Sequence, residues 1–205
     1  MKFKCTPLEG HLQLCTAVAF SKEGTNACSA SADGTCRVWR VEDATCYFVL
    51  DGDKRVACCN FSADGKMIIT GDWGYQTRIW DAVAGQIVMS LAGHQGKLTA
   101  SCFRADGNLM LTASEDKNLR TWDPRRGISV AFTAPDEVLD CGFCTDMVSI
   151  VGACKNGMLL VWDIRKPDQT RKEIDAHGTE WVTACALAPS GNTALTCRFE
   201  DFFEY

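Results

Sequence analysis

Residues 111–123 read LTASEDKNLRTWD, and the Trp-Asp pair that closes this stretch recurs along the chain. Trp39, Trp80, Trp122 and Trp162 lie 41, 42 and 40 residues apart, and the last three are each followed by Asp. A fixed period of this length shows that one structural unit is repeated, because unrelated elements would not keep a constant spacing. The chain is therefore expected to be an array of similar units of about 40 residues.

Other columns of residues keep the same register. A Phe stands 19 residues before each Trp, and a turn glycine follows four residues after the Phe in three of these four repeats. These columns are Phe20, Phe61, Phe103 and Phe143, then Gly24, Gly65 and Gly107, with Met147 as the exception and Gly191 in a fifth copy. Between the turns, apolar and polar residues alternate with the period of half-buried strands. The pattern predicts an all-β propeller of four-stranded blades.

The residues in these columns resemble those of the WD-repeat family, and the resemblance extends over almost the whole chain. In that family a His, a Ser or Thr, an Asp and the Trp join in a buried network within each blade, which we call the tetrad. Two repeats contain all four residue types at identical spacing. These tetrads are His11, Ser29, Asp33 and Trp39, and His94, Thr112, Asp116 and Trp122. The resemblance implies that both tetrads have a structural role. Their members pair polar groups that would cost free energy if they were buried without partners.

The remaining repeats depart from the tetrad pattern. The second has Thr70 and Trp80 but Gly74 at the Asp position, and the fourth has Gly152 and Asn156 in place of Ser/Thr and Asp. The fifth has His177 and Thr196, with Glu200 or Asp201 at the acidic position, and its Trp position would lie one residue beyond the last. We expect one domain over 1–205, with repeats at 10–50, 51–91, 92–132, 133–175 and an incomplete one at 176–205.

The ends of the chain leave two architectures open. Residues 1–9 are interpreted as an outer strand (Phe3–Leu8) or a lead-in before the first repeat. If this segment pairs with the last repeat, the blades close a five-bladed ring. Otherwise, four full blades and an incomplete fifth form an open arc of a larger propeller. We favour the open arc, because propellers of the WD family usually have more blades.

Composition restricts the class of protein. The net charge is −5 with no basic run, which argues against nucleic acid as the main ligand. No apolar stretch reaches 18 residues and the first 30 lack a signal pattern, so we expect no membrane partner. We expect a cytoplasmic protein, with the nucleus as the alternative.

The thirteen cysteines are assigned to the core rather than to a metal or disulfides. Cys59, Cys141 and Cys185 occupy one inner-strand position, where a thiol behaves as a small hydrophobe. The Cys141-x-x-Cys144 pair lies on a predicted strand, where residues three apart face opposite sides. We expect reduced thiols, no cofactor and no metal. No catalytic motif occurs, and the tetrad repeats as a structural network would, so an enzyme is not expected.

Function is therefore expected at the loops. In the family, the loop before each innermost strand and the turn between the second and third strands lie on one face. Aromatic and basic residues, which dominate binding hot spots, occur at these positions. The candidate contacts are Arg55, Trp73, Lys97, Trp181 and Phe199. An alternative for Trp73 is that it folds back onto the second blade and compensates for Gly74.

A narrower resemblance concerns two consecutive boxes of the form Trp-Asp-x-Arg. They resemble those of substrate receptors that dock on the adaptor of cullin-4 ubiquitin ligases. By that resemblance the arginines would contact the adaptor. The residues concerned are Asp123, Arg125, Asp163 and Arg165. An Arg in this position is also common in WD proteins as a plain surface ion pair. The first functional hypothesis is therefore a non-catalytic protein-interaction scaffold, and the ligase receptor is the alternative.

Overall fold

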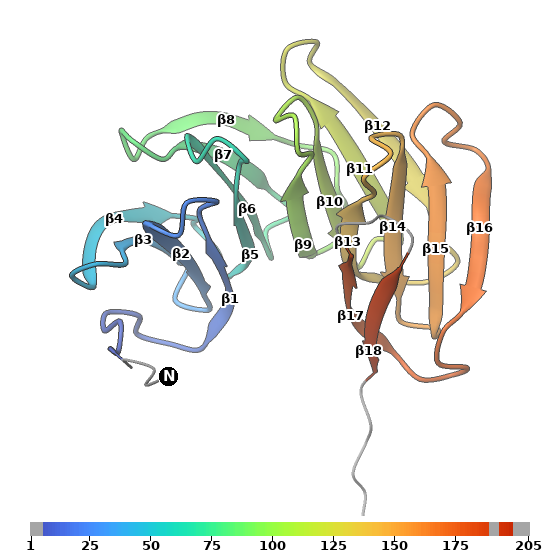
Figure 1. The fold of residues 1–205 in the computed structure, drawn as a ribbon, viewed down its shortest axis with the longest axis horizontal. Coiled ribbons are helices and arrows are strands. Elements are labelled where there is room, and N and C mark those ends of the chain that lie inside the picture. Colours follow the sequence, from blue (N-terminus) through green and yellow to red (C-terminus); the bar gives the residue numbers. More distant parts are fainter. Residues whose placement is uncertain (1–5, 189–192, 199–205) are drawn as a thin grey trace, which may run out of the picture.

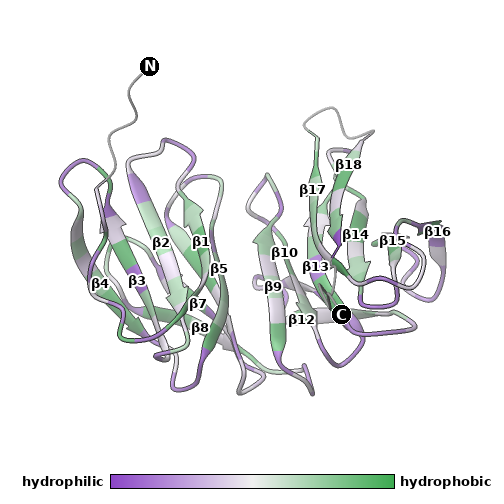
Figure 2. Ribbon diagram, turned by 90° about the horizontal axis from the view of Figure 1, so that it is seen from below, coloured by the Kyte–Doolittle hydropathy of each residue, from purple (hydrophilic) through white to green (hydrophobic). Residues whose placement is uncertain are grey.

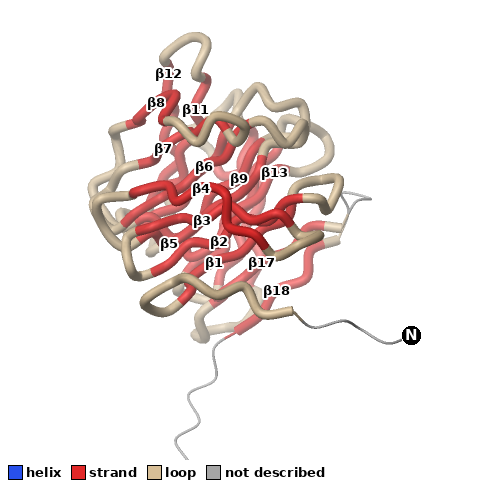
Figure 3. Tube along the Cα trace, turned by 90° about the vertical axis from the view of Figure 1, so that its left-hand side faces the viewer, coloured by secondary structure: helices blue, strands red, loops and turns tan. Residues whose placement is uncertain are grey.

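The protein is all-β. A computed structural model describes residues 6–188 and 193–198, and it contains 18 strands and no helix within them (Figure 3). No helix of the described residues could therefore cross a membrane. The strands form four antiparallel four-stranded sheets and one two-stranded sheet, each in sequence order. We number these sheets as blades 1 to 5.

The blades follow the repeats. Blade 1 contains β1 (Cys15–Phe20), β2 (Asn26–Ser31), β3 (Thr35–Arg40) and β4 (Thr45–Asp51). Blade 2 contains β5 (Val56–Phe61), β6 (Met67–Asp72), β7 (Thr77–Asp81) and β8 (Ile87–Leu91). Blade 3 contains β9 (Leu98–Phe103), β10 (Met110–Ser114), β11 (Asn118–Asp123) and β12 (Ile128–Thr133). Blade 4 contains β13 (Val138–Phe143), β14 (Ser149–Cys154), β15 (Met158–Asp163) and β16 (Thr170–Asp175). Blade 5 contains β17 (Val182–Leu187) and β18 (Ala194–Arg198).

The turn between the first and second strands of blades 1 to 4 requires a residue with a positive φ angle. Gly24, Gly65 and Gly107 have φ angles of 69°, 70° and 71°, which glycine adopts without a Cβ penalty. Met147 holds the same turn of blade 4 with φ at 64°. The backbone shape is therefore preserved where the glycine is missing, at a steric cost to the methionine.

The blades stand side by side in an open arc (Figure 1). The innermost strands contact one another in order, β1 with β5, β5 with β9, β9 with β13 and β13 with β17. In the described part of the chain, no strand pairs blade 1 with blade 5. The described residues therefore form an open arc and not a five-bladed ring.

Exposure of the Phe column also marks the open end. Phe61, at the interface between blades 1 and 2, is 6% exposed, whereas Phe20 on β1 is 65% exposed because no blade of the described residues packs on that side. The expected outer strand Phe3–Leu8 is only partly testable. Its first three residues lie outside the described part, and the other three form no strand.

The hydrophobic core lies mainly between neighbouring blades. One cluster joins Cys28, Val38 and Leu50 of blade 1 to Phe61 and Trp80 of blade 2. Another joins Leu111 and Leu119 of blade 3 to Cys141 and Trp162 of blade 4. Figure 2 shows apolar residues concentrated in the strands and hydrophilic residues in the connecting loops. Each blade thus depends on its neighbours to bury its apolar surface.

Candidate functional site

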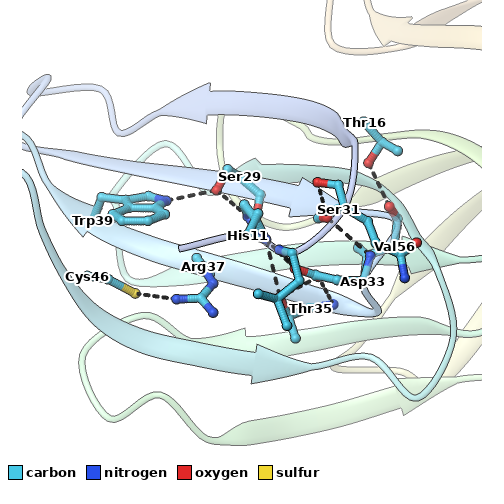
Figure 4. Close-up of polar contacts among 12 residues, drawn as sticks. His11, Thr16, Ser29, Ser31, Asp33, Thr35, Arg37, Trp39, Cys46 and Val56 are labelled. Carbon is cyan, nitrogen blue, oxygen red and sulfur yellow. Dashed lines mark hydrogen bonds and ion pairs between the residues drawn. The ribbon is translucent and has the colours of Figure 1, made fainter. Parts of the chain in front are cut away.

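The tetrad of blade 1 is assembled from the loop before β1, from strands β2 and β3, and from the turn between these two strands (Figure 4). The Trp39 indole N–H donates to Ser29 Oγ at 2.8 Å, and Ser29 Oγ lies 2.7 Å from His11 Nε2. His11 Nδ1 donates to Asp33 Oδ2 at 2.9 Å. The same carboxylate accepts the Leu12 amide and the Thr35 hydroxyl. The network therefore joins the loop before β1 to the β2–β3 turn.

Blade 3 repeats this arrangement with a threonine. His94 Nδ1–H donates to Asp116 Oδ2 at 2.8 Å, and the Thr112 hydroxyl lies 2.8 Å from His94 Nε2. Trp122 Nε1–H donates to Thr112 Oγ1 at 2.9 Å. Burial lowers the pKa of His94, so that it stays neutral. Burial raises the pKa of Asp116, but hydrogen bonds from the Gln95 amide and His94 outweigh this and hold it below its ordinary value.

The His94 side chain is completely buried, so no substrate can reach its imidazole. Every polar atom of the network is already engaged with another member or with the backbone. This geometry suits a structural network that fixes one packing, and it offers no free nucleophile.

Blade 2 has an ion pair in place of a tetrad, which the sequence analysis missed. Thr70 still accepts from Trp80 Nε1 at 2.8 Å, but Gly52 stands where blades 1 and 3 have His. Arg78 fills this region: it donates to the Gly52 carbonyl at 2.8 Å and pairs with the buried carboxylate of Asp72. Asp72 also accepts the Gly74 amide at 2.7 Å. Asp72 and Arg78 therefore occupy the place of the missing Asp and His, whereas the Trp73 ring lies against Arg55 and Lys97.

Blades 4 and 5 keep fewer of these contacts. In blade 4, Trp162 packs close to Gly152, and Asn156 only accepts the Met158 amide at 3.2 Å. In blade 5, His177 Nε2 lies 2.9 Å from Thr196 Oγ1. The acidic candidates of this blade, Glu200 and Asp201, lie outside the described residues. The polar networks are thus concentrated in the first three blades.

The candidate binding positions meet in pairs at one end of the blades. In each of blades 1 to 4, a backbone N–H in the turn between the second and third strands donates a hydrogen bond to a backbone carbonyl in the loop before the innermost strand. Trp73 N–H donates to Arg55 O at 2.9 Å, Glu115 N–H to Lys97 O at 3.0 Å and Lys155 N–H to Glu137 O at 2.9 Å. Side chains at these positions are therefore neighbours.

Trp73 is the centre of a small surface cluster. Its ring is flanked by two cations, with Arg55 Cζ 4.2 Å and Lys97 Nζ 4.3 Å from the ring centroid. Trp73 is 39% exposed, and Lys97 also pairs with Glu115 at 3.4 Å. Arg55 forms no ion pair with a carboxylate of the described residues. We call Arg55, Trp73, Lys97 and Glu115 the Trp73 cluster; it joins blade 2 to blade 3.

A second aromatic lies further along the same end of the arc. Lys155 Nζ lies 4.6 Å from the Trp181 ring centroid and donates to Glu137 Oε2 at 2.8 Å. The Glu137 carboxylate raises the pKa of Lys155, which therefore stays charged. Trp181 thus repeats in blades 4 and 5 the cation–aromatic contact of the Trp73 cluster. Phe199, the remaining candidate on this face, lies outside the described residues.

The two Trp-Asp-x-Arg boxes lie at the opposite end of the strands, because each follows the third strand of its blade. Arg165 forms a two-pronged pair with Asp163, with Nε and Nη2 at 2.8 and 2.5 Å from its two oxygens. This pair holds the pKa of Asp163 well below its ordinary value. Arg125 is less tightly held, with Nε 3.5 Å from Asp123. Both guanidinium groups are largely exposed.

All twelve cysteines of the described residues are free. Cys59 and Cys141 are buried between blades, as the register predicts, and Cys185 is half-buried. The interpretation of the Cys141-x-x-Cys144 pair was incomplete. Because β13 ends at Phe143, Cys144 lies just past the strand, and both cysteines line one cavity of about 480 Å³.

Comparisons with known proteins agree with this geometry. The family model described as "WD domain, G-beta repeat" matches residues 2–40, 44–81 and 85–123, more than half of the chain. A guanine nucleotide-binding protein subunit beta of Nicotiana tabacum is 28% identical over 55% of this chain and 33% of its own length. The nuclear distribution protein nudF of Aspergillus niger is 25% identical over 83% of this chain and 44% of its own.

Coatomer subunit beta'-2 of Arabidopsis thaliana is 32% identical over 50% of this chain and 12% of its own length. The chain therefore spans less than half the length of these relatives. The match of the repeats, the two complete tetrads and the four-stranded blades lead to one conclusion: the chain belongs to the WD-repeat family, WD domain, G-beta repeat.

Proposed function

We propose that this chain is a non-catalytic scaffold that binds other proteins, and that the Trp73 cluster is a principal contact. The observation that carries this proposal is an indole left 39% exposed between two cations. Tryptophan and arginine are the residues that dominate binding hot spots. Relatives named as subunits of larger assemblies, a G-protein subunit beta and a coatomer subunit, support the same role.

The chemistry of the cluster indicates what it would bind. Arg55 has no carboxylate partner among the described residues, and Trp73 holds its guanidinium in place by stacking. An acidic side chain of a partner could therefore pair with Arg55 without displacing an internal ion pair. We propose the cytoplasm or the nucleus as the place of this interaction, which the absence of disulfides among the described cysteines supports.

The proposal predicts that Trp73→Ala weakens partner binding and leaves the fold intact. Loss of a hot-spot tryptophan costs about 2 kcal/mol or more, about a thirtyfold rise in Kd. The tagged protein would be expressed in its native cells, and the captured proteins would be quantified by mass spectrometry. Val83→Ala is the matched control, because Val83 is an exposed apolar residue at the opposite end of blade 2. If both variants capture the same proteins in the same amounts, the Trp73 cluster is not the contact.

A second candidate function is docking on the adaptor of a cullin-4 ubiquitin ligase. The observation that favours it is a groove of about 330 Å³ between blades 3 and 4, beside the first box. It is lined by Asp123, Arg125, Val130 and by Ile164 of the second box. The aspartates orient the arginines, while the exposed guanidinium groups keep N–H donors free for a partner's oxygens.

For this second function, Arg125→Ala combined with Arg165→Ala should reduce adaptor capture by about tenfold or more, because a charge paired across a desolvated interface is costly to remove. The fold should be unaffected, since exposed ion pairs contribute little to folding. Capture of purified adaptor by the double variant and by the wild type would be compared. Arg40→Ala is a control, because Arg40 is an exposed arginine at the end of β3 of blade 1. A wild-type chain that does not capture the adaptor excludes this function.

A further inference from the structure

Three cysteines meet between blades 1 and 2. Cys28 on β2, Cys36 on β3 and Cys59 on β5 place their Sγ atoms within 4.8 Å of one another. Their exposed fractions are 0%, 1% and 5%. Among the described residues, no other group of three His, Cys, Asp or Glu side chains comes this close together. We call these residues the sulfur triangle.

Strand register explains how the triangle forms. Cys28 is paired with Val38 across the β2–β3 ladder, so Cys36, two residues before Val38, lies diagonally opposite on the same face of the sheet. This face packs against β5, which brings in Cys59 from blade 2. The thiol of Cys59 also lies 3.8 Å from the Ala17 carbonyl, which fixes it near β1.

The same three positions recur at every interface between blades, and only this interface has sulfur at all three. The equivalent residues are Ile69, Thr77 and Ser101, then Leu111, Leu119 and Cys141, then Val151, Leu159 and Cys185. At the last two interfaces these residues belong to a single hydrophobic cluster, as the triangle does. Aliphatic and hydroxyl side chains with at most one thiol therefore fill this space at the other interfaces, and packing does not require three thiols.

We propose that the sulfur triangle binds one monovalent copper ion, Cu(I). The ligands are three soft sulfur atoms, and soft thiolates select Cu(I) and zinc among the common metals. Structural zinc sites are closed by four ligands, and no fourth His, Cys, Asp or Glu joins the group in the described residues. Three sulfur donors without a fourth ligand suit Cu(I) better than zinc.

The binding step needs no oxidant or reductant. Copper remains in the +1 state, and each thiol that becomes a ligand gives its proton to the solvent as its Cu–S bond forms. The charge of the ion offsets part of the thiolate charge in a surrounding of apolar residues that include Ala30, Val38 and Phe61. Exclusion of water by this cluster would also protect Cu(I) from oxidation.

The experiment is an anaerobic competition for Cu(I) between the reduced chain and a coloured Cu(I) chelator, bicinchoninate. The wild type should withdraw one equivalent of copper. Loss of a residue that only supports a metal ligand lowers metal affinity about 10–100-fold. Cys36→Leu removes a ligand itself, so it should lower the affinity for Cu(I) by more than this. Cys28→Val and Cys59→Ser should do the same. Each introduced residue is one that another blade has at that position, as in Leu119, Val151 and Ser101, so the fold should be retained.

Cys58→Ala is the matched control, since Cys58 is a buried neighbour that points to the Gly71 carbonyl and its position is alanine in blades 1 and 3. It should leave copper binding unchanged.

Thirteen reactive thiols in the denatured wild type would show that no disulfide has formed before the titration. X-ray absorption of the loaded protein should show copper with three sulfur neighbours. Equal binding by the wild type and Cys36→Leu, equal loss in Cys58→Ala, or tighter binding of Zn²⁺ than of Cu(I) would overturn the proposal.

Discussion

Asp116→Ala is expected to lower the free energy of unfolding by about 3–5 kcal/mol, because it removes a carboxylate that accepts from three donors, and one hydrogen bond to a charged group contributes about 1.5–3 kcal/mol. The carboxylate holds His94 at 2.8 Å and also accepts the amides of Gln95 and Asn118 at 2.8 and 2.9 Å. Without it, the buried imidazole loses its acceptor and the turn loses its link to the loop before β9. Urea unfolding followed by tryptophan fluorescence would measure the change as a shift in midpoint at constant m-value.

Asn156→Ala supplies the internal comparison for this prediction. Asn156 occupies the equivalent position of blade 4, yet its side-chain oxygen accepts a single amide, that of Met158 at 3.2 Å. Its replacement should cost about 1 kcal/mol, the usual net value of one hydrogen bond. If the two variants shift the urea midpoint equally, the tetrad of blade 3 does not stabilise the fold in the way its geometry indicates.

The repeat register made the blades predictable, because it reports backbone geometry directly. Each Trp marks the end of a third strand, and the glycines at 24, 65 and 107 all have the positive φ that the turn requires. Even the exception is informative: Met147 adopts the same φ, so the turn is imposed by the neighbouring strands rather than by glycine. The residues of the two complete tetrads could be named in advance for the same reason, since they repeat at fixed spacing.

Contacts made by residues that differ from blade to blade could not be predicted from the register. The Trp73 cluster depends on Lys97 of blade 3 reaching a ring of blade 2, and sequence spacing says nothing of that distance. The sulfur triangle likewise needs two strands of one blade and one strand of the next. The ion pair between Asp72 and Arg78 did leave a signal in the sequence. Asp72 stands where blades 1 and 3 have Ser31 and Ser114, in the same blade that lacks the His and Asp of the tetrad.

Arg78→Met is expected to destabilise the chain by about 3–5 kcal/mol, because it leaves the Asp72 carboxylate buried without its partner. Asp72 is 2% exposed, and its only ion pair in the described residues is with Arg78. Methionine retains much of the volume of arginine, so the loss should come from the charge rather than from a cavity. The Gly52 carbonyl remains satisfied by the Lys54 amide at 2.8 Å. The urea midpoint would again measure the effect.

Combining Arg78→Met with Asp72→Ser should restore most of the lost stability. The serine hydroxyl can accept the Gly74 amide, as Ser31 and Ser114 accept the amides two residues further on at 3.1 Å. With neither charge present, no uncompensated ion remains in the core, so the cost of leaving one buried charge without its partner is avoided. The double-mutant cycle should therefore show strong favourable coupling between the two changes. Additive losses would mean that Asp72 and Arg78 act independently and that the pair does not replace the missing tetrad of blade 2.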